Sequence, residues 1–214
     1  MIALVMCGGR GSRFVTQEKI EKPLSCIRGQ TLIEKVLHAV ILSGQFNKIV
    51  CVSSRNSPYT TELLKKKYRS VDKIGVIIGE GLGYSRDLSK TLNSMAEQKV
   101  FTFPSDLALL DAATVKKLVS HCTPTVQNTC IAAIAEKSFL SPIGLTCSSV
   151  IAINKKEYCY TGVCGFYVGI PFNDELITEC YSIINELRVA VNINTARDLE
   201  VAEHLLNSFN QDCL

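Results

Sequence analysis

The residues best suited to bind phosphate lie near the start of the chain, where Cys7-Gly8-Gly9-Arg10-Gly11-Ser12-Arg13 follows a short apolar run. Glycines let backbone N–H groups approach phosphate oxygens, and a hydroxyl and fixed guanidinium groups add charge-assisted hydrogen bonds. The segment is not the dinucleotide fingerprint G-x-G-x-x-G, because the third glycine of that pattern is absent, and no Gly-Lys-Ser/Thr follows as in a P-loop. We interpret it as a phosphate-binding loop of another kind; a plain strand-to-helix turn with solvated arginines is the alternative.

A carboxylate follows a second apolar run. Residues 100–103 read as a buried strand, and Pro104-Ser105-Asp106 comes directly after it. Open α/β sheets bind ligands at the carboxyl ends of their strands, and a single carboxylate there suits a divalent cation that bridges phosphates. We predict that Asp106 binds such a cation. A role as the N-terminal cap of a following turn is the alternative, and the two roles do not exclude each other.

Two further pairs of residues carry weaker signals. Asn192 and Asn194 alternate, so they face the same side of an extended strand, although a strand-to-helix turn uses the same residue types. Gly162 and Gly165 interrupt an apolar run. Glycines in a strand permit close approach by a ligand or by another backbone, and a β-bulge is the alternative.

The apolar pattern predicts an α/β scaffold for these residues. Strands and helices alternate in the first half, with strands expected at 2–6, 48–52, 74–78 and 100–103 and helices at 31–44, 58–68 and 85–96. This order favours a Rossmann-like, mostly parallel sheet with helices on both faces. The second half is less regular, with strands expected at 130–135, 150–153 and 163–170 and helices at 111–121, at 174–187 and from 195 onward. We expect residues 1–214 to form one domain.

The composition is that of an ordinary globular protein. Of 214 residues, 47% are hydrophobic and 20% are charged, which argues against disorder. The net charge of +3 is too small to indicate a nucleic-acid partner. No apolar run reaches the roughly 18–20 residues that a membrane span needs. The ten cysteines show no C-x-x-C pair typical of structural zinc, and no signal peptide precedes them, so we expect a reduced, cytoplasmic protein.

Together, the glycine-rich loop and Glu21-Lys22-Pro23-Leu24 resemble the G-G-x-G-[ST]-R…K-P-L signature of nucleotidyltransferases. The molybdenum-cofactor guanylyltransferases and many sugar-1-phosphate nucleotidyltransferases share this signature, which wraps the triphosphate of an NTP. The spacing from Arg13 to Lys22 is longer than usual by a few residues. The segments 81–88 and 191–199 look like their counterparts in the archaeal guanylyltransferases that act on adenosylcobinamide phosphate, which have about this length.

The resemblance implies an Mg²⁺-dependent transfer of GMP from GTP to adenosylcobinamide phosphate, a step of cobalamin biosynthesis in which pyrophosphate leaves. It implies that Arg13 and Lys22 stabilise the charge of the phosphates. It also implies that Asp106 holds the metal, with Asn192 or Asn194 as a second contact. The remaining site residues are implied to be, for the nucleotide, Gly8, Gly9, Arg10, Gly11, Ser12, Gly83 and Asp87, and, for the acceptor, Gly162 and Gly165.

Other functions stay open at this point. The same chemistry could act on molybdopterin or on a sugar 1-phosphate, and a homodimer is compatible with the sequence. A non-catalytic, nucleotide-binding regulatory domain is disfavoured by the joint presence of Arg13, Lys22 and Asp106. An NAD-dependent oxidoreductase is disfavoured by the glycine spacing.

Overall fold

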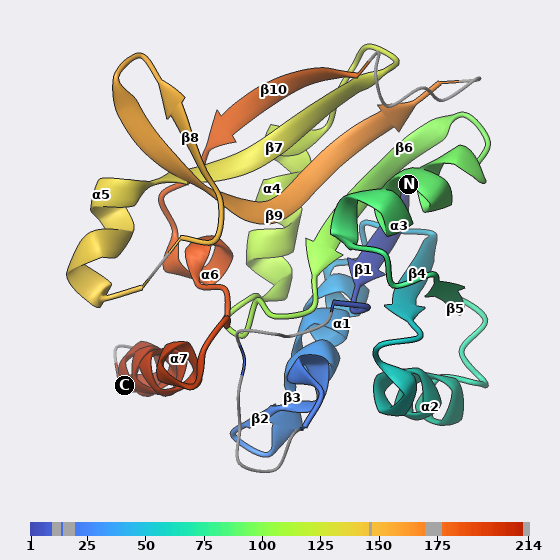
Figure 1. Ribbon diagram of the computed structural model, residues 1–214, viewed down its shortest axis with the longest axis horizontal. Helices are drawn as coiled ribbons and strands as arrows, with labels where there is room; N and C mark the ends of the chain where they lie inside the picture. The colour runs from blue at the N-terminus through green and yellow to red at the C-terminus, as the bar shows by residue number, and fades with distance from the viewer. Residues whose placement is uncertain (10–13, 15–19, 146, 170–176, 212–214) are drawn as a thin grey trace.

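A computed structural model describes residues 1–9, 14, 20–145, 147–169 and 177–211 of the protein (Figure 1). Arg10, Gly11, Ser12 and Arg13 therefore lie outside the described residues. Within the described part, eight strands form one sheet in the order β10-β7-β9-β6-β1-β4-β5, and β8 pairs with β9. The expected fold class, a mostly parallel α/β sheet, is confirmed.

The first half of the chain builds the parallel part of the sheet, from β1 (Ile2–Met6), β4 (Lys48–Ser54), β5 (Ile74–Gly79) and β6 (Gln98–Pro104). β1 lies in the middle and pairs in parallel with both β4 and β6. Its run Ile-Ala-Leu-Val-Met is almost entirely buried, as expected for a strand that is covered on both faces. The four strands expected here from the sequence are confirmed.

The second half extends the sheet with β7 (Thr129–Glu136), β8 (Val150–Ile153), β9 (Lys156–Val168) and β10 (Thr178–Ile183). β9 runs antiparallel to β6, β7 and β8, whereas β10 is parallel to β7. The helix expected at 174–187 is wrong where the structure describes it, because Thr178–Ile183 is a strand and only Leu187–Ala190 forms a short helix, α6. Ile177, Tyr181 and Ile184 recur at helical spacing, but pairing with β7 decides the conformation.

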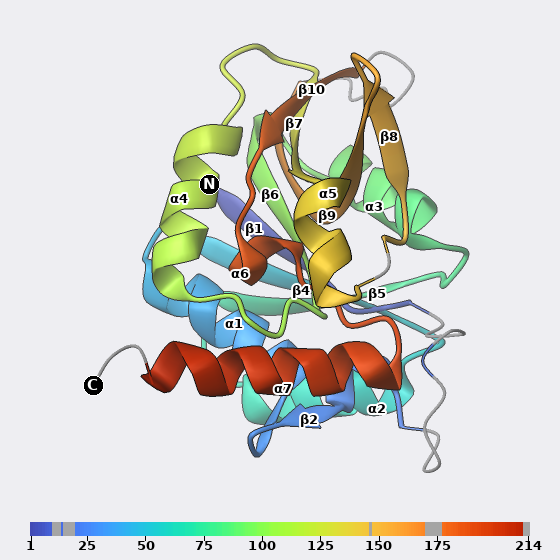
Figure 2. The ribbon, with the colours of Figure 1, turned by 90° about the vertical axis from the view of Figure 1, so that its left-hand side faces the viewer.

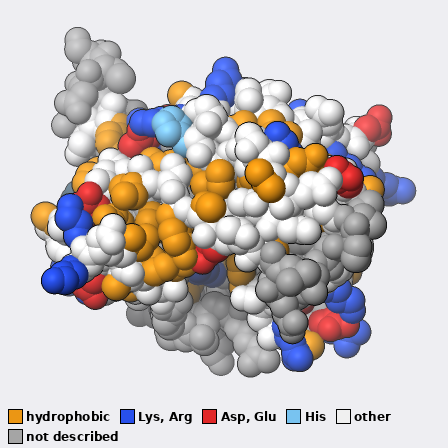
Figure 3. Space-filling model, turned by 90° about the horizontal axis from the view of Figure 1, so that it is seen from above, with side chains coloured by type: hydrophobic (Ala, Val, Ile, Leu, Met, Phe, Trp, Pro, Cys, Tyr) orange, Lys and Arg blue, Asp and Glu red, His pale blue; other side chains and the backbone are white. Residues whose placement is uncertain are grey.

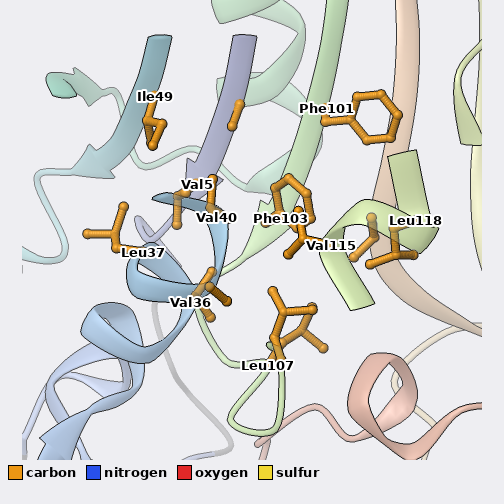
Figure 4. Close-up of a cluster of buried hydrophobic side chains, with 14 of the residues drawn as sticks. Val5, Val36, Leu37, Val40, Ile49, Phe101, Phe103, Leu107, Val115 and Leu118 are labelled. Atoms are coloured by element: carbon orange, nitrogen blue, oxygen red, sulfur yellow. The ribbon is translucent and has the colours of Figure 1, made fainter. Parts of the chain in front are cut away.

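Helices cover both faces of the sheet. α1 (Leu32–Ser43), α2 (Pro58–Lys67) and α4 (Ala112–Cys122) lie on one face, and α3 (Tyr84–Asn93) packs Leu88 and Leu92 on the other. Figure 4 shows the first of these two cores, where side chains of α1 and α4 meet those of β1, β4 and β6. α1 begins at the predicted capping box of Thr31 and Glu34 and ends at Gly44, whose φ is 69°.

The last helix, α7 (Ala196–Gln211), lies along one side of the molecule near the short hairpin of β2 (Cys26–Ile27) and β3 (Gln30–Thr31) (Figure 2). Its first turn is capped as expected, because the Asp198 carboxylate accepts from the backbone N–H of Thr195 at 2.8 Å and Asp198 N–H donates to Thr195 Oγ1 at 3.2 Å. The remaining short helices are η1 (Lys22–Leu24), α5 (Lys137–Leu140) and η2 (Ser141–Ile143).

The cysteines do not all stay reduced in the structure. A disulfide joins Cys147 to Cys159, whose Cα atoms are 5.5 Å apart. The expectation of reduced cysteines is therefore wrong for this pair. Cys159 lies on β9 opposite the start of β8, and Cys147 lies in the segment just before β8. The other cysteines that the structure describes are free, and Cys7, Cys51, Cys122 and Cys130 are buried.

None of the helices that the structure describes is both long and apolar enough to cross a membrane. On the face shown in Figure 3, Lys and Arg side chains are scattered around apolar and uncharged ones rather than gathered in one basic patch.

Candidate active site

A cleft opens where β1 and β6 end, at the edge of the sheet where the carboxyl ends of parallel strands meet. It brings together residues from the loop after β1, from η1, from the start of α3 and from the loop after β6. Its lining consists of Met6, Gly8, Gly9, Lys22, Pro23, Val52, Tyr84, Asp87, Pro104, Ser105 and Asp106. Five of the residues predicted from the sequence therefore share one cleft, namely Gly8, Gly9, Lys22, Asp87 and Asp106.

The centre of the cleft is an ion pair. Lys22 Nζ lies 2.5 Å from Asp106 Oδ2, although 84 positions separate the two residues in the chain. Both side chains are largely buried, with 18% of Lys22 and 11% of Asp106 exposed. The other carboxylate oxygen, Oδ1, accepts from the Asn192 amide at 3.2 Å. The Asp106 carboxylate thus faces the cleft, while Asp111 is the residue that caps α4.

Glu21 holds Lys22 in place from outside the cleft. Its carboxylate accepts from the backbone N–H groups of Tyr59 (2.9 Å) and Thr60 (2.8 Å) and from the Thr60 hydroxyl (2.6 Å). These groups form the first turn of α2, where free N–H groups and the helix dipole favour a negative charge. These three hydrogen bonds anchor the start of η1 to α2 and so fix the direction of the neighbouring Lys22.

The glycine-rich loop of residues 79–83 is tied down by Asp87. Asp87 is 6% exposed, and its carboxylate accepts from the backbone N–H groups of Glu80 at 3.0 Å and of Gly81 at 3.2 and 3.3 Å. The space beside Gly79 is filled by the same carboxylate, since an added Cβ would lie 2.8 Å from Asp87 Cγ. Both carboxylate oxygens of Asp87 therefore accept from the backbone of the loop. The carbonyl groups of the loop are then better placed than Asp87 to bind a ligand.

A turn after β4 completes this side of the cleft. Ser54 Oγ donates to the Gly8 carbonyl at 2.5 Å, and the Asn56 amide donates to the Gly81 carbonyl at 3.0 Å. Gly8 must be a glycine here, because an added Cβ would lie 2.8 Å from Ser54 Cβ, whereas Gly9 has open space beside it. The turn thus fixes the loops after β1 and β5 relative to each other.

Tyr84 bridges the two halves of the sheet. It opens α3 after Gly83, whose φ of 127° suits only glycine, and its phenol donates to the Gly162 carbonyl of β9 at 3.4 Å. Desolvation of the phenol oxygen, with a contribution from the Cys164 thiol, raises the pKa of Tyr84, although 46% of the residue is exposed. Sequence reasoning missed Tyr84, as it did Ser54, Asn56 and the bonds of Glu21, because each acts through a partner distant in the chain.

The two glycines predicted at the acceptor have different surroundings. Gly162, with φ 81°, lies where the register between β7 and β9 shifts, and an added Cβ would lie 2.9 Å from Pro104. This is a β-bulge beside the cleft. Gly165 is buried against α4, where an added Cβ would lie 1.8 Å from the Cys122 carbonyl oxygen. Close approach of the α4 backbone thus accounts for a glycine at position 165, and the acceptor role of Gly165 stays a prediction.

The two asparagines also differ. The segment 191–195 forms no strand, in contrast to the extended strand that the sequence suggests. Asn192 donates both to Asp106 and to the Thr161 carbonyl (3.0 Å), which joins the end of β6 to the bulge of β9. The Asn194 side chain donates to the Asn192 carbonyl at 3.5 Å, so Asn192 is the one that meets Asp106 among the described contacts.

The oxygen atoms available in the cleft determine whether a magnesium ion fits there. Within the described residues no group of three or more His, Cys, Asp or Glu side chains is placed to hold a metal. Mg²⁺, however, is commonly bound by one or two carboxylates together with substrate phosphates and water. The Asp106 carboxylate, with the Asn192 amide beside it, fits an ion that arrives with a nucleotide. Lys22 places a positive charge beside the same carboxylate.

Comparison with known proteins places the chain in a family and shows which solved structures share its fold. Residues 3–158 match the family model of the MobA-like NTP transferase domain. An adenosylcobinamide-phosphate guanylyltransferase of Methanocaldococcus jannaschii is 30% identical over 96% of this chain and 97% of its own length. Among solved structures, a putative glucose-1-phosphate thymidylyltransferase from Bacillus anthracis (TM-score 0.64, 11% identity, 96% of this chain and 95% of that one) shares the fold. So does the inositol-1-phosphate CTP transferase from T. maritima (TM-score 0.64, 14% identity, 94% of each chain).

Proposed function

Because this chain belongs to the MobA-like NTP transferase family, we propose that it transfers the GMP group of GTP to adenosylcobinamide phosphate and releases pyrophosphate. The family supports nucleotidyl transfer in general. The choice of guanine and of the acceptor rests on the relative in Methanocaldococcus jannaschii, which this chain matches over nearly its whole length. The observation that carries the proposal is the pair of Lys22 and Asp106 at the carboxyl ends of the central strands.

The reaction needs alignment and charge neutralisation rather than covalent help. An acceptor phosphate oxygen attacks the α-phosphorus of GTP, and the bond to the β-phosphate oxygen breaks as pyrophosphate leaves. The attacking phosphate is already ionised near pH 7, so no general base is required. Lys22 stabilises the charge that gathers on the transferred group, and Arg13 does the same for pyrophosphate. Gly8 and Gly9, with Arg10, Gly11 and Ser12, offer donors to the β- and γ-phosphates.

Magnesium belongs to this proposal. Asp106 would hold it with the Asn192 amide, and when bound it neutralises phosphate charge and orients the triphosphate. Lys22 shares the carboxylate, so the ion pair holds Asp106 in place at the cleft before substrates arrive.

Guanine recognition falls to the loop of residues 79–83. The N1–H and N2–H₂ groups of guanine are donors, whereas adenine presents an unprotonated N1 at the same edge. Asp87 is occupied with the backbone of the loop, and Asn56 already binds the Gly81 carbonyl. The remaining carbonyl groups of the loop are therefore our preferred guanine acceptors, with Asp87 holding them in position.

The test is a pyrophosphate-release assay with Mg²⁺, GTP and one acceptor at a time: adenosylcobinamide phosphate, molybdopterin or a sugar 1-phosphate. We expect release with adenosylcobinamide phosphate and a loss of roughly 10²–10³ in turnover for Lys22→Met. Lys48→Met, at an exposed lysine outside the cleft, is the matched control. Release with another acceptor alone would reassign the substrate, and no release with any acceptor would favour the regulatory domain.

A further inference from the structure

Beyond the cleft, three polar side chains form a cluster on the open face of the sheet. Tyr181 Oη donates to Glu179 Oε2 at 2.6 Å, and Tyr160 Oη donates to the same oxygen at 3.2 Å. The two phenol oxygens lie 3.4 Å apart, and the rings meet edge to face with centroids 6.2 Å apart. Glu179 is exposed and both tyrosines are half-buried, so the cluster faces solvent from a fixed frame.

The cluster lies on the same face of the sheet as α3, the helix that begins at Tyr84. The strand register pairs Tyr181 with Ala132, which in turn pairs with Cys164, and it pairs Tyr160 with Ile134. The two tyrosines therefore point to the same side of the sheet as Cys164. Tyr160 directly precedes Thr161, whose carbonyl accepts from the Asn192 amide that also binds Asp106. The cluster therefore borders the cleft on the side of the β9 bulge and away from η1.

The hydrogen bonds set the polarity of this surface. Tyr181 donates its phenol proton to Glu179, and Tyr160 donates to Glu179 and, at 3.4 Å, to the Tyr181 oxygen, so the Tyr160 oxygen turns its lone pairs outward. The bond to Glu179, followed by the bond to Tyr160, raises the pKa of Tyr181 well above its ordinary range, and burial raises the pKa of Tyr160. The surface thus carries a negative charge and hydrogen-bond acceptors, the opposite of the Lys22 end of the cleft.

On the basis of the proposed function, we propose that Tyr160, Tyr181 and Glu179 form a subsite that binds N–H donors on the body of the acceptor molecule. An anionic, acceptor-rich surface repels a phosphate and accepts from primary amides, which a cobinamide carries around its ring. The acceptor is then oriented with its phosphate toward Lys22 and Asp106 and its amides over β9 and β10. The three residues act on acceptor binding and orientation, away from the reacting atoms.

Steady-state kinetics of Tyr181→Phe, Tyr160→Phe and Glu179→Gln test this subsite. We expect KM for adenosylcobinamide phosphate to rise roughly 3- to 10-fold, with KM for GTP and kcat at saturating acceptor unchanged. Tyr167→Phe is the matched control, because Tyr167 lies on the same strand and donates to Glu97 at 3.2 Å, but at the far end of β9. Thermal unfolding confirms that each variant is folded.

A binding measurement separates this subsite from the proposed function. Equilibrium dialysis of adenosylcobinamide phosphate, followed by its visible absorbance, needs no turnover. Wild-type protein that binds it but releases no pyrophosphate refutes the proposed function, and weaker binding by Tyr181→Phe than by Tyr167→Phe still supports the subsite. An unchanged KM and unchanged binding in all three variants, or no binding by the wild type, overturns the subsite.

Discussion

At the scale of single residues, the cleft is organised around one carboxylate that two side chains reach from different parts of the chain. Asp106 comes from the end of β6, Lys22 from η1 and Asn192 from the segment before α7. The pair is largely buried, so its attraction mainly offsets the cost of desolvating the two charges, and because both side chains line the cleft the charges remain within reach of a ligand.

Asp106→Asn is expected to reduce turnover by at least about 10²-fold and to raise the Mg²⁺ concentration needed for half-maximal rate. The amide keeps the shape but loses the charge and leaves the largely buried Lys22 without its counter-ion, so we also expect some loss of unfolding free energy. Initial rates over a magnesium titration and urea unfolding of the same variant give both quantities. Normal rates at saturating Mg²⁺ together with lost stability would make Asp106 a structural residue.

Glu21→Ala is expected to affect both properties. Removal of the carboxylate leaves the first turn of α2 without its acceptor, which costs about 1 kcal/mol of unfolding free energy, and it frees Lys22 to move. Turnover should fall, whereas Glu21→Gln, which keeps an acceptor oxygen, should recover most of the stability. Thermal unfolding and kcat are measured for both variants, and a Glu21→Ala enzyme with wild-type kcat would remove the anchoring role.

Some of these residues could be predicted from the sequence and others could not. Lys22 and Asp106 were accessible because one belongs to a motif and the other follows an apolar strand. Glu21, Asn56 and Tyr84 act on partners 39, 25 and 78 positions away, and no local pattern encodes such pairs. Arg13 and Ser12 lie outside the described residues, so their roles stay predictions.

At the scale of elements, loops between rigid strands and helices determine what the cleft can bind. The loop of residues 79–83 connects β5 to α3 and is held by Asp87 on one side and Asn56 on the other. Its backbone is thus fixed before a nucleotide arrives, which favours selectivity because less ordering entropy is lost on binding.

We expect the wild-type protein to bind GTP more tightly than ATP. Bound adenine would cover carbonyl groups of the loop and leave them unpaired, a cost of roughly 1–3 kcal/mol. Asp87→Ala should weaken GTP binding and reduce the preference, because the loop loses its anchor. Isothermal titration of both nucleotides against both proteins measures this. Equal affinities in the wild type would argue against guanine as the base, and full selectivity in Asp87→Ala would show that the loop needs no such anchor.

Gly165→Ala tests the packing of β9 on α4. The new methyl group would collide with the Cys122 carbonyl, and overpacking of this kind costs about 1–3 kcal/mol or more. Gly75→Ala on β5 is the control, because its added Cβ has no heavy atom within 4 Å. Urea unfolding of both variants compares them. A Gly165→Ala protein as stable as the wild type would mean that α4 shifts freely and that packing does not require a glycine at position 165.

The order of elements was largely predictable, since apolar runs and helix caps are local signals. Thr31 and Glu34 predicted the start of α1, and the apolar run before Gly8 predicted β1. β10 was missed because its residues are also spaced as on a helix, and only β7, some 50 positions earlier, supplies the partner that makes it a strand. The antiparallel direction of β9 has the same non-local origin.

At the scale of the whole molecule, the core determines how stability responds to pH. Burial raises the pKa of the Cys51 thiol from its ordinary 9 to about 12. The unfolded chain releases this proton above pH 9 and the folded chain does not, so the stability present below pH 9 is lost as the pH rises toward 12. Cys51 lies on β4 in the core between α1 and the sheet.

Between pH 8 and 10, the wild-type protein should therefore lose about 1 kcal/mol more unfolding free energy than Cys51→Ala. Cys26→Ala, at an exposed cysteine, should follow the wild type. Urea unfolding at the two pH values measures the difference. Parallel losses in the wild type and Cys51→Ala would contradict the raised pKa.

The central claim is that this cleft transfers a nucleotidyl group, and the fate of labelled phosphate tests it most directly. GTP labelled at the α-phosphate and, separately, at the γ-phosphate is incubated with Mg²⁺, adenosylcobinamide phosphate and either wild-type protein or Lys22→Met. We predict that the α-label appears in the cobinamide product and the γ-label in pyrophosphate, and that Lys22→Met slows both together. A γ-label released as inorganic phosphate, with the α-label left in GDP, would contradict nucleotidyl transfer.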